Sequence, residues 1–382
     1  MHIYIIGSGP AGVNAAQAAR KENEDAKVTV LSNDTHLPYF RLRLFDVIED
    51  PSSKEKLILH PMSWYQDQGI DLQLNTTVKA IHPEDHEIEL DDGTKLAYDR
   101  LIIATGSKSF VPPIKGSEHK DVHTLWTMDE AITIGEKLDG KDKAVVIGGG
   151  LLGLEAGHAM VKKGLDVTII EVLPRLMTRQ LDDQAAALFK KHMENKGVHI
   201  ITAATTEEIV SDETGQLKEV RLASGETFPA DIVFISAGVR AVLDPVQDSG
   251  IQIDRCIVVN DRMETNVKDV YAAGDNVLFD NRWYGLWQIA IAQGRIAGAN
   301  AAGSNVSYTM PVPPYVMNMM GTRISSSGVI DNQHDVPAYH EEIKMDDDAC
   351  TYEKLVFSGD RLIGFVLLGD TKRQNELQKR ML

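Results

Sequence analysis

Short apolar runs alternate along the chain with stretches in which apolar residues return every three or four positions. The run at residues 2–6 is followed by such a stretch at residues 10 to about 21, and then by a second apolar run at 27–31. The same order of strand, helix and strand returns over residues 143–171. Because alternating strands and helices form parallel sheets that are covered on both faces, the pattern predicts an α/β fold with two doubly wound βαβ units.

In each unit the first strand turns into the helix through the pattern G-x-G-x-x-G. The first glycine permits the tight turn, the second lets the backbone approach a pyrophosphate, and the third lets helix and strand pack closely. The helix N-terminus then offers free N–H groups and a partial positive charge to the phosphates. Two such turns predict two bound dinucleotides, and the economical pair is FAD and a nicotinamide dinucleotide that reduces it. The turns are Gly7-Ser8-Gly9-Pro10-Ala11-Gly12 and Gly148-Gly149-Gly150-Leu151-Leu152-Gly153.

The second unit is predicted to be inserted into the first domain. A buried-type strand that ends in a small residue and glycine stands before it at 101–106, and another stands after it at 233–238. They mark the places where the chain leaves and re-enters the first domain. The expected domains are a discontinuous Rossmann-like FAD-binding domain (1–106 and 236–308), an inserted Rossmann-like NADH-binding domain (107–235) and a C-terminal α+β domain (309–382).

The C-terminal domain is predicted from a change of pattern after Gly303. The proline-rich residues 310–314 form the connection. Two strands are expected at 352–357 and 362–368, joined by a hairpin turn at Gly359-Asp360 and followed by a closing helix from about residue 371.

The net charge and the cysteine content limit the classes of partner that the chain can bind and the compartment in which we expect it. At a net charge of −17 the chain repels nucleic acid and anionic membranes, and no apolar stretch is long enough to span a bilayer. Because the first strand begins at residue 2, we expect no signal peptide. Cys256 and Cys350 form no C-x-x-C motif or disulfide framework, and the 12 histidines show no metal-binding spacing. We therefore expect a cytoplasmic protein without a metal site.

Carboxylates at the ends of strands predict contacts with ligand hydroxyls. Glu171 directly follows the second strand of the second unit, where a carboxylate binds the ribose and repels a 2′-phosphate, so that NADH is favoured over NADPH. Arg175 is close enough in sequence to accommodate that phosphate, which leaves NADPH as the alternative. The corresponding acid of the first unit is Asp34, and Asp275 ends a further apolar strand. The alternatives are a solvated strand end for Glu171 and Asp34, and a helix-capping turn for Asp275.

Together these motifs resemble those of the FAD/NAD(P)-dependent pyridine nucleotide oxidoreductases, a family of flavoproteins that bind two dinucleotides. Its ferredoxin, rubredoxin and nitrite reductase members resemble this chain in the flavin-side loop, and its NADH:rubredoxin reductases resemble it in the short C-terminal domain. The resemblance implies an FAD-dependent enzyme that takes hydride from NADH, with the nicotinamide stacked on the flavin, and passes single electrons to a small redox protein such as rubredoxin. It rests on the two glycine turns, Ala104-Thr105-Gly106, Ala237-Gly238, Ala273-Gly274-Asp275, Leu37-Pro38-Tyr39-Phe40-Arg41 and Gly364-Phe365-Val366-Leu367-Leu368-Gly369.

The resemblance also implies which residues hold each cofactor. A helix beginning at Trp287-Gln288 would direct its positive end at the flavin N1–C2=O edge, which would ease hydride acceptance. The alternative is that Trp287 is a core aromatic. The FAD site would comprise Gly7, Gly9, Pro10, Ala11, Gly12, Asp34, Arg41, Ala104, Thr105, Gly106, Gly274, Asp275 and Trp287. The NADH site would comprise Gly148, Gly150, Leu151, Leu152, Gly153, Glu155, Glu171 and Gly238.

The chain departs from its relatives at two points. It has no cysteine pair in the first domain and no cysteine at residues 32–60, so a thiol relay is excluded and electrons must leave directly from the flavin. Where many ferredoxin-reductase relatives place a lysine that pairs with the glutamate near flavin N5, this chain has Asp46. Glu155 therefore needs another partner, for which Arg43 is the candidate, and without a cation the pKa of a buried Glu155 would rise. The alternative is that Arg43 is a surface residue. We expect no side chain to act as an obligatory acid or base, because the cofactors carry the chemistry.

The end of the chain is locally basic. We expect Lys372, Arg373, Lys379 and Arg380 to steer an acidic electron carrier, although such a run is also typical of a solvated helix end. Two other functions remain open. One is an NADH oxidase or a flavoprotein that feeds a nitrite-reductase-type complex, and the other is an NAD-sensing flavoprotein with a regulatory partner. A monomer is favoured, because the C-terminal region is shorter than the dimerisation domain of glutathione-reductase-like members.

Overall fold

The computed structural model describes residues 1–309, 313–319, 321–331 and 336–381. Residues 310–312 of the expected proline-rich connection lie outside this part of the chain. The chain divides into two compact units. Unit 1 comprises Met1–Arg41, Lys54–Lys108 and Val239–Val312, and unit 2 comprises Leu42–Ser53, Ser109–Gly238 and Pro313–Leu382.

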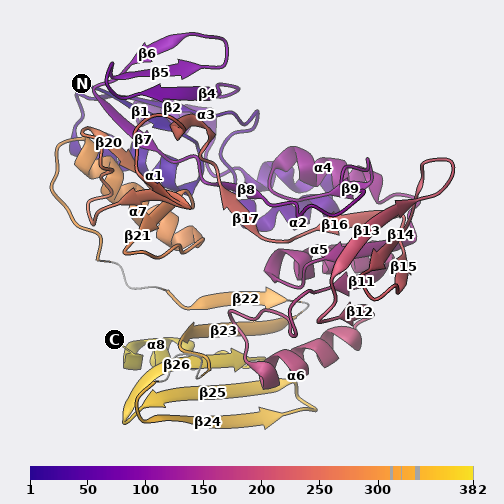
Figure 1. Cartoon of the computed structure of the whole chain (residues 1–382). Coiled ribbons are helices and arrows are strands. Elements are labelled where there is room, and N and C mark those ends of the chain that lie inside the picture. The colour runs from indigo at the N-terminus through magenta and orange to yellow at the C-terminus, as the bar shows by residue number, and fades with distance from the viewer. Residues whose placement is uncertain (310–312, 320, 332–335, 382) are drawn as a thin grey trace. The chain divides into compact units, whose positions relative to one another are not determined.

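Unit 1 is built on a five-stranded parallel sheet in the order β20-β7-β1-β2-β3 (Figure 1). Strand β1 is buried along almost its whole length, as expected for a central strand of a parallel sheet. The predicted strand–helix–strand unit is present, with Pro10 in the first turn of α1, where its missing N–H has no intrahelical partner. These elements are β1 (His2–Ile6), α1 (Pro10–Glu22), β2 (Lys27–Leu31), β3 (Ile70–Gln73), β7 (Arg100–Ile103), β20 (Val270–Ala272) and α7 (Trp287–Ala301).

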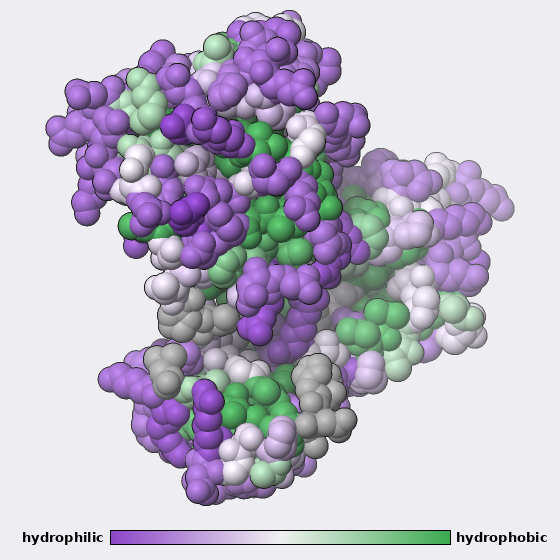
Figure 2. Space-filling view, turned by 60° about the vertical axis from the view of Figure 1, so that its left-hand side comes forward, coloured by the Kyte–Doolittle hydropathy of each residue, from purple (hydrophilic) through white to green (hydrophobic). Residues whose placement is uncertain are grey.

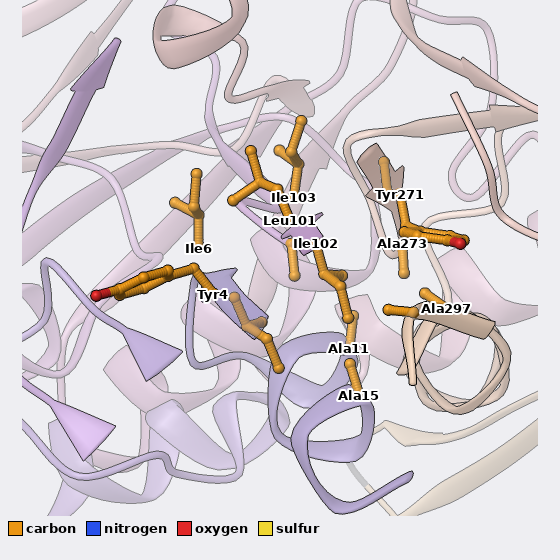
Figure 3. Packing of buried hydrophobic residues seen from close by; sticks show 14 of the residues in the cluster. Tyr4, Ile6, Ala11, Ala15, Leu101, Ile102, Ile103, Tyr271, Ala273 and Ala297 are labelled. Atoms are coloured by element: carbon orange, nitrogen blue, oxygen red, sulfur yellow. The ribbon is translucent and has the colours of Figure 1, made fainter. Parts of the chain in front are cut away.

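Helices α1 and α7 pack closely against each other, and small residues make this approach possible. A Cβ added at Gly294 of α7 would lie 2.2 Å from the carbonyl oxygen of Ala11, and one added at Gly298 would lie 2.1 Å from that of Ala15. Figure 3 shows Ala11 and Ala15 of α1 near Ala297 of α7, beside the apolar residues of β7. The pair of helices thus fixes the position of the α1 N-terminus.

The remaining elements of unit 1 are short. Six of the short strands form two three-stranded sheets that are separate from the parallel sheet. They are α3 (Met62–Asp67), β4 (Val78–His82), β5 (Glu87–Leu90), β6 (Lys95–Ala97), β18 (Ile253–Asp254), β19 (Cys256–Val259) and β21 (Val277–Phe279), with the paired strands β8 (Ser107–Ser109) and β17 (Val239–Ala241) where the chain passes from one unit to the other.

Unit 2 contains the second parallel sheet, in the order β12-β11-β10-β16-β9. The short helix α2 (Leu44–Glu49) packs here with α4 and α5, although the sequence assigns its residues to the first domain. Helix α4 begins with a capping box, in which Thr127 and Glu130 each accept a backbone N–H of the other. The elements are β9 (Val122–His123), α4 (Met128–Lys137), β10 (Lys143–Ile147), α5 (Leu151–Lys162), β11 (Asp166–Ile170), α6 (Asp183–Glu194), β12 (Val198–Ile201) and β16 (Ile232–Ile235), with the antiparallel sheet β13 (Thr206–Ser211), β14 (Leu217–Leu222) and β15 (Thr227–Pro229).

The C-terminal part of unit 2 is a five-stranded antiparallel sheet in the order β22-β23-β26-β25-β24. The predicted hairpin is present, and the closing helix begins three residues later than expected, at Gln374. Its elements are β22 (Tyr315–Met319), β23 (Thr322–Gly328), β24 (Tyr339–Asp346), β25 (Thr351–Ser358), β26 (Arg361–Leu368) and α8 (Gln374–Met381).

The predicted fold class is confirmed, with two doubly wound βαβ sheets and a small C-terminal α+β part. Hydrophilic residues cover most of the face seen in Figure 2, and apolar residues gather there in smaller patches. In the described part of the chain, no helix combines the length and the apolar character that a membrane span requires.

Two candidate dinucleotide sites

The glycine turn of unit 1 has the geometry of a phosphate cradle. Gly7 has a φ of +104°, and a Cβ at this position would lie 2.2 Å from the carbonyl oxygen of Ala104. A Cβ at Gly12 would lie 1.9 Å from the carbonyl oxygen of Gly7, whereas a Cβ at Gly9 would meet no atom within 4 Å. Gly9 is also the N-cap of α1 and provides no side-chain cap. The first and third glycines therefore permit close packing, and the second leaves room beside uncapped N–H groups.

Unit 2 repeats this arrangement residue for residue. A Cβ at Gly148 would lie 2.2 Å from the carbonyl oxygen of Ser236, and one at Gly153 would lie 1.9 Å from that of Gly148. Gly150 faces open space and is the uncapped N-cap of α5, whose first turn contains Leu151 and Leu152. Both turns thus fit a dinucleotide pyrophosphate, because each begins a helix whose N-cap glycine provides no capping side chain for the first N–H groups.

Glu171 lies at the end of β11 and faces its own glycine turn. One carboxylate oxygen accepts the N–H of Gly149 at 2.6 Å, the other accepts that of Leu173 at 2.7 Å, and the residue is only 8 % exposed. The carboxylate is therefore held beside the turn and is not a solvated strand end. The nearby Arg175 is bound to Asp183 at 2.7 Å and to Asp331 at 3.2 Å, so its guanidinium is already engaged by two carboxylates.

In unit 1, Ser32 occupies the position that Glu171 has in unit 2. The register places Leu31 opposite the end of β1, and the Ser32 hydroxyl lies 2.7 Å from that of Ser8 in the glycine turn. Asp34 lies two residues further on, where it accepts the N–H of His36 at 2.9 Å and the hydroxyl of Tyr39 at 3.1 Å. Sequence reasoning selected Asp34 for its charge, whereas aligning the two units by their strand ends places Ser32 at this position.

Asp275 follows β20 and is held by a neighbour that the sequence analysis did not select. Ser107 donates to its carboxylate at 2.9 Å, and Trp283 donates to its carbonyl oxygen at 2.8 Å. Burial raises the pKa of Asp275, while the hydrogen bond from Ser107 and the charge of Arg41 partly offset that rise. Ser107 directly follows the Ala104-Thr105-Gly106 motif, and this adjacency was the signal that could have identified it.

The other residues that the sequence predicts for the FAD site make contacts within unit 1. The Ala104 N–H donates to Ile6 at 2.8 Å, which joins the end of β7 to that of β1, and the Thr105 hydroxyl donates to the Val242 carbonyl at 2.7 Å. Gly106 and Gly274 have φ angles of +68° and +98°, which favour glycine, and the Gly274 N–H donates to Gln293 of α7 at 3.0 Å.

Helix α7 begins at Trp287, as the sequence predicts. Leu286 is its N-cap and provides no side-chain cap, so the N–H groups of its first turn are free of capping side chains. Trp287 packs edge to face on Phe40, with ring centroids 5.0 Å apart, and is only partly buried. Trp287 therefore belongs to a surface aromatic pair beside a helix N-terminus.

Glu155, on α5 of unit 2, has a carboxylate as a neighbour. Burial and the negative charge of Asp46 raise the pKa of Glu155 to about 7. Arg43 is bound to Asp46, with its Nε 2.7 Å from the carboxylate, so the expected pairing of Arg43 with Glu155 is wrong. Asp46 lies three residues after Arg43, a spacing at which oppositely charged side chains can pair locally.

Tyr315 is a second neighbour of Glu155 that the sequence analysis did not identify. Burial raises the pKa of Tyr315, the charge of Arg179 lowers it, and that of Glu155 raises it again. Tyr315 is therefore near enough to Glu155 to feel its charge. No local motif marks Tyr315, so the sequence alone gave no signal for this neighbourhood. The last predicted NADH-site residue, Gly238, has a φ of +95° and accepts the N–H of Phe110 at 2.9 Å.

In the structure, ion pairs offset part of the positive charge of the basic C-terminal segment. Arg373 binds Glu353 at 2.7 Å and also Glu376, and Lys372 lies 3.4 Å from Asp370. Asp370 and Glu353, which take part in these pairs, lie outside the run 372–380. Among the described residues, no group of three or more His, Cys, Asp or Glu could hold a metal ion.

Comparison with known proteins identifies the family. The family model described as pyridine nucleotide-disulphide oxidoreductase matches residues 1–294, and the model described as rubredoxin NAD⁺ reductase C-terminal domain matches residues 313–382. The chain belongs to the pyridine nucleotide-disulphide oxidoreductase family. FAD and NADH are typical of this family, and the chain is accordingly an oxidoreductase.

This oxidoreductase is similar to proteins with named activities. It is 31 % identical to an NADH-rubredoxin oxidoreductase of Clostridium acetobutylicum, over 96 % of this chain and 92 % of that one. The crystal structure of NADH:rubredoxin oxidoreductase from C. acetobutylicum is 30 % identical, covers 100 % of this chain and 94 % of its own, and superposes with a TM-score of 0.83. The chain is also 31 % identical to a Bacillus subtilis nitrite reductase [NAD(P)H], over 98 % of its own length but 46 % of that protein.

Proposed function

We propose that this oxidoreductase uses FAD to take hydride from NADH and passes single electrons to a small acidic redox protein, most specifically rubredoxin. The observation that carries the proposal is the pair of glycine turns, one in each unit, each with an open middle glycine and an uncapped helix N-terminus. The similarity to the clostridial NADH-rubredoxin oxidoreductase over almost the whole chain supports rubredoxin as the acceptor.

Unit 1 would hold FAD through backbone groups at the start of α1 and side chains at the strand ends. The N–H groups after Gly9 would bind the pyrophosphate, Ser32 or Asp34 the ribose, and Asp275, kept in place by Ser107, a further hydroxyl. The α7 N-terminus would place a partial positive charge in the same site. Bound FAD would supply the conversion of one two-electron donation into single-electron transfers.

Unit 2 would hold NADH in preference to NADPH. The N–H groups after Gly150 would bind the pyrophosphate, and Glu171 would accept the ribose hydroxyls with the lone pairs that its two backbone hydrogen bonds leave free. This carboxylate would repel the 2′-phosphate of NADPH. The charge of Arg175 is already offset by Asp183 and Asp331, so it is less able to neutralise such a phosphate, which supports the choice of NADH.

The absence of a thiol relay follows from where the cysteines lie. Cys256 and Cys350 are both free and buried, and neither lies in the first βαβ unit. Electrons would therefore pass directly from the flavin to the acceptor. The domain assignment that accompanies this proposal is FAD in residues 1–106 and 236–308, NADH in 107–235 and a C-terminal domain at 309–382.

Anaerobic titration of the purified protein with NADH tests the proposal. We expect a yellow protein whose flavin absorbance bleaches with one equivalent of NADH and much more slowly with NADPH. The reduced protein should then be reoxidised rapidly by rubredoxin and slowly by dioxygen. A colourless protein that cannot be reconstituted with FAD, or a bound flavin that stays oxidised under excess NADH and NADPH, would rule the function out.

One alternative has specific support. The similarity to the nitrite reductase of B. subtilis extends over 98 % of this chain, which favours a role in feeding electrons to a nitrite-reductase-type complex. A carrier screen separates the two functions. Slow reaction with every rubredoxin, together with fast reduction of an iron–sulfur or haem domain of the nitrite reductase type, would favour the alternative.

A further inference from the structure

The loop between β11 and α6 lies against the glycine turn of unit 2. A Cβ added at Gly149 would lie 2.5 Å from Cδ2 of Leu176 and 3.2 Å from a carboxylate oxygen of Glu171, so both side chains border the turn. The Met177 N–H also donates to the Gly149 carbonyl oxygen at 3.3 Å. Because Arg175 directly precedes Leu176, its backbone lies beside the turn, where an arginine could bind a 2′-phosphate.

The Arg175 guanidinium is held by hydrogen bonds from all three of its nitrogen atoms. Nη1 donates to Asp183 at 2.7 Å, Nη2 donates to Asp331 at 3.2 Å, and Nε donates to the Leu181 carbonyl oxygen at 3.1 Å. The arginine side chain is only 17 % exposed. A cation whose charge is offset by two adjacent carboxylates attracts a further anion only weakly.

The two carboxylates come from different parts of unit 2. Asp183 is the first residue of α6, and Asp331 follows β23 of the C-terminal sheet, 156 residues after Arg175. The N-cap of α6, Asp182, lies 2.9 Å from Lys354 of β25, and Figure 1 shows α6 beside this sheet. The C-terminal sheet therefore supplies one partner of the arginine and attaches the helix that carries the other.

We propose that Asp183 and Asp331 are specificity-determining residues, which favour NADH by keeping the charge of Arg175 offset beside the ribose site. The inference rests on the proposed function, in which the glycine turn of unit 2 and Glu171 bind NADH. Glu171 repels a 2′-phosphate, and the two aspartates deprive the site of the cation that would offset this repulsion. A residue of the C-terminal part thus takes part in selecting the coenzyme.

Asp183→Asn combined with Asp331→Asn tests the proposal, because asparagine keeps the shape and a hydrogen-bond acceptor but removes the charge. The probes are AMP and adenosine 2′,5′-bisphosphate, which differ only in the 2′-phosphate. Each is titrated calorimetrically into the FAD-loaded full chain at low ionic strength. We expect the wild type to bind AMP more tightly, and the double variant to shift the affinity ratio towards the bisphosphate by roughly tenfold, the effect of one charged hydrogen bond. The affinity ratio of NADP⁺ to NAD⁺ should shift in the same direction.

The shift should depend on the positive charge of residue 175. Arg175→Gln, introduced into the double variant, should remove most of the shift, whereas Arg175→Lys should retain part of it, because lysine is also a cation. In the otherwise wild-type chain, Arg175→Gln should not increase the affinity for the bisphosphate. A loss of loop structure would instead weaken AMP and the bisphosphate together and would leave their affinity ratio unchanged.

The matched control is Glu194→Gln combined with Asp347→Asn. It removes two negative charges from α6 and the C-terminal part, at carboxylates that pair with Lys190 and Lys191, and should keep the wild-type affinity ratio. An unchanged ratio in the Asp183/Asp331 variant, an equal shift in the control, or a shift that persists with Arg175→Gln would overturn the selectivity proposal and leave NADH binding intact. If neither AMP nor NAD⁺ bound to any of these chains, the dinucleotide site itself, and the proposed function with it, would be wrong.

Discussion

Burial determines the protonation state of Glu155 in the folded chain. Its pKa is about 7 because the carboxyl group has lost hydration and faces Asp46. In the unfolded chain the pKa returns to its ordinary value near 4.5. Since the folded value is the higher one, the contribution of Glu155 to stability is complete below about pH 4.5 and is lost as the pH rises towards 7.

Glu155→Gln should therefore remove a pH dependence of stability. We expect the variant to be more stable than the wild type at pH 8.5, by about 1–3 kcal/mol, and close to it at pH 4.5, because the amide is never charged. Urea unfolding at a series of pH values measures the difference. Glu136→Gln changes an exposed carboxylate of the same unit and should leave the pH profile unaltered. Parallel profiles for wild type and Glu155→Gln would contradict the assignment.

The packing of α1 against α7 shows how a helix pair positions a phosphate cradle. Gly294 and Gly298 lie against the backbone of α1 at the first turns of that helix. Because the obstacle is a carbonyl oxygen and not a flexible side chain, an added methyl group must move a whole helix. The α1 N-terminus, where the pyrophosphate of FAD would bind, would move with it.

Gly294→Ala should destabilise the protein although alanine favours helix formation. The gain in helix propensity is about 1 kcal/mol, and overpacking against backbone costs about 1–3 kcal/mol or more, so we expect a net loss and weaker retention of FAD. Thermal unfolding and the flavin content of the purified protein report the two effects. Arg295→Ala, on the exposed side of the same helix, should change stability by less than about 0.5 kcal/mol. Equal stability of Gly294→Ala and wild type would show that the helices can separate without cost.

At the scale of the whole molecule, a buried ion network attaches the C-terminal sheet to the second dinucleotide-binding domain within unit 2. Lys354 of β25, whose side chain is 5 % exposed, lies 2.9 Å from Asp182 and 2.6 Å from Glu341. Asp182 also caps α6 and accepts the Tyr352 hydroxyl at 2.7 Å. Burial lowers the pKa of Lys354, but the two carboxylates raise it further, so the net shift is upward and the lysine stays charged.

Lys354→Met should be strongly destabilising, because it leaves the buried carboxylate of Asp182 without a cation, beside the more exposed carboxylate of Glu341. We expect a loss of about 3–5 kcal/mol, measured by chemical unfolding. Lys344→Met removes an exposed lysine of the adjacent strand and should cost less than about 1 kcal/mol. Combining Lys354→Met with Asp182→Asn and Glu341→Gln should restore part of the lost stability. If the single variant were as stable as the Lys344 control, the network would have no role in attachment.

The net charge of the whole molecule affects how an acidic electron acceptor can dock on it. On a chain of net charge −17, an acidic carrier needs a local basic surface, and Lys372, Lys379 and Arg380 are exposed members of the basic C-terminal segment. Lys372→Glu combined with Lys379→Glu should raise the KM for rubredoxin roughly threefold or more at low salt and flatten its dependence on ionic strength. The kcat with a small artificial acceptor and the KM for NADH should not change. An unaltered KM for rubredoxin at low salt would place the docking surface elsewhere.

The sequence by itself determined the two strand–turn–helix units, the C-terminal hairpin and the start of α7. These features are encoded locally, because the spacing of glycines and apolar residues fixes backbone angles and the buried face within a few residues. The roles of Gly7, Gly12 and Gly150 follow from such spacing.

Only the tertiary structure decided which side chains meet across long stretches of sequence. It brought Tyr315 towards Glu155, placed Ser107 on Asp275 and joined Lys354 to Asp182. Such contacts depend on how whole elements pack, and packing is the sum of many weak contributions from residues distant in sequence. A local sequence pattern therefore does not predict these long-range contacts.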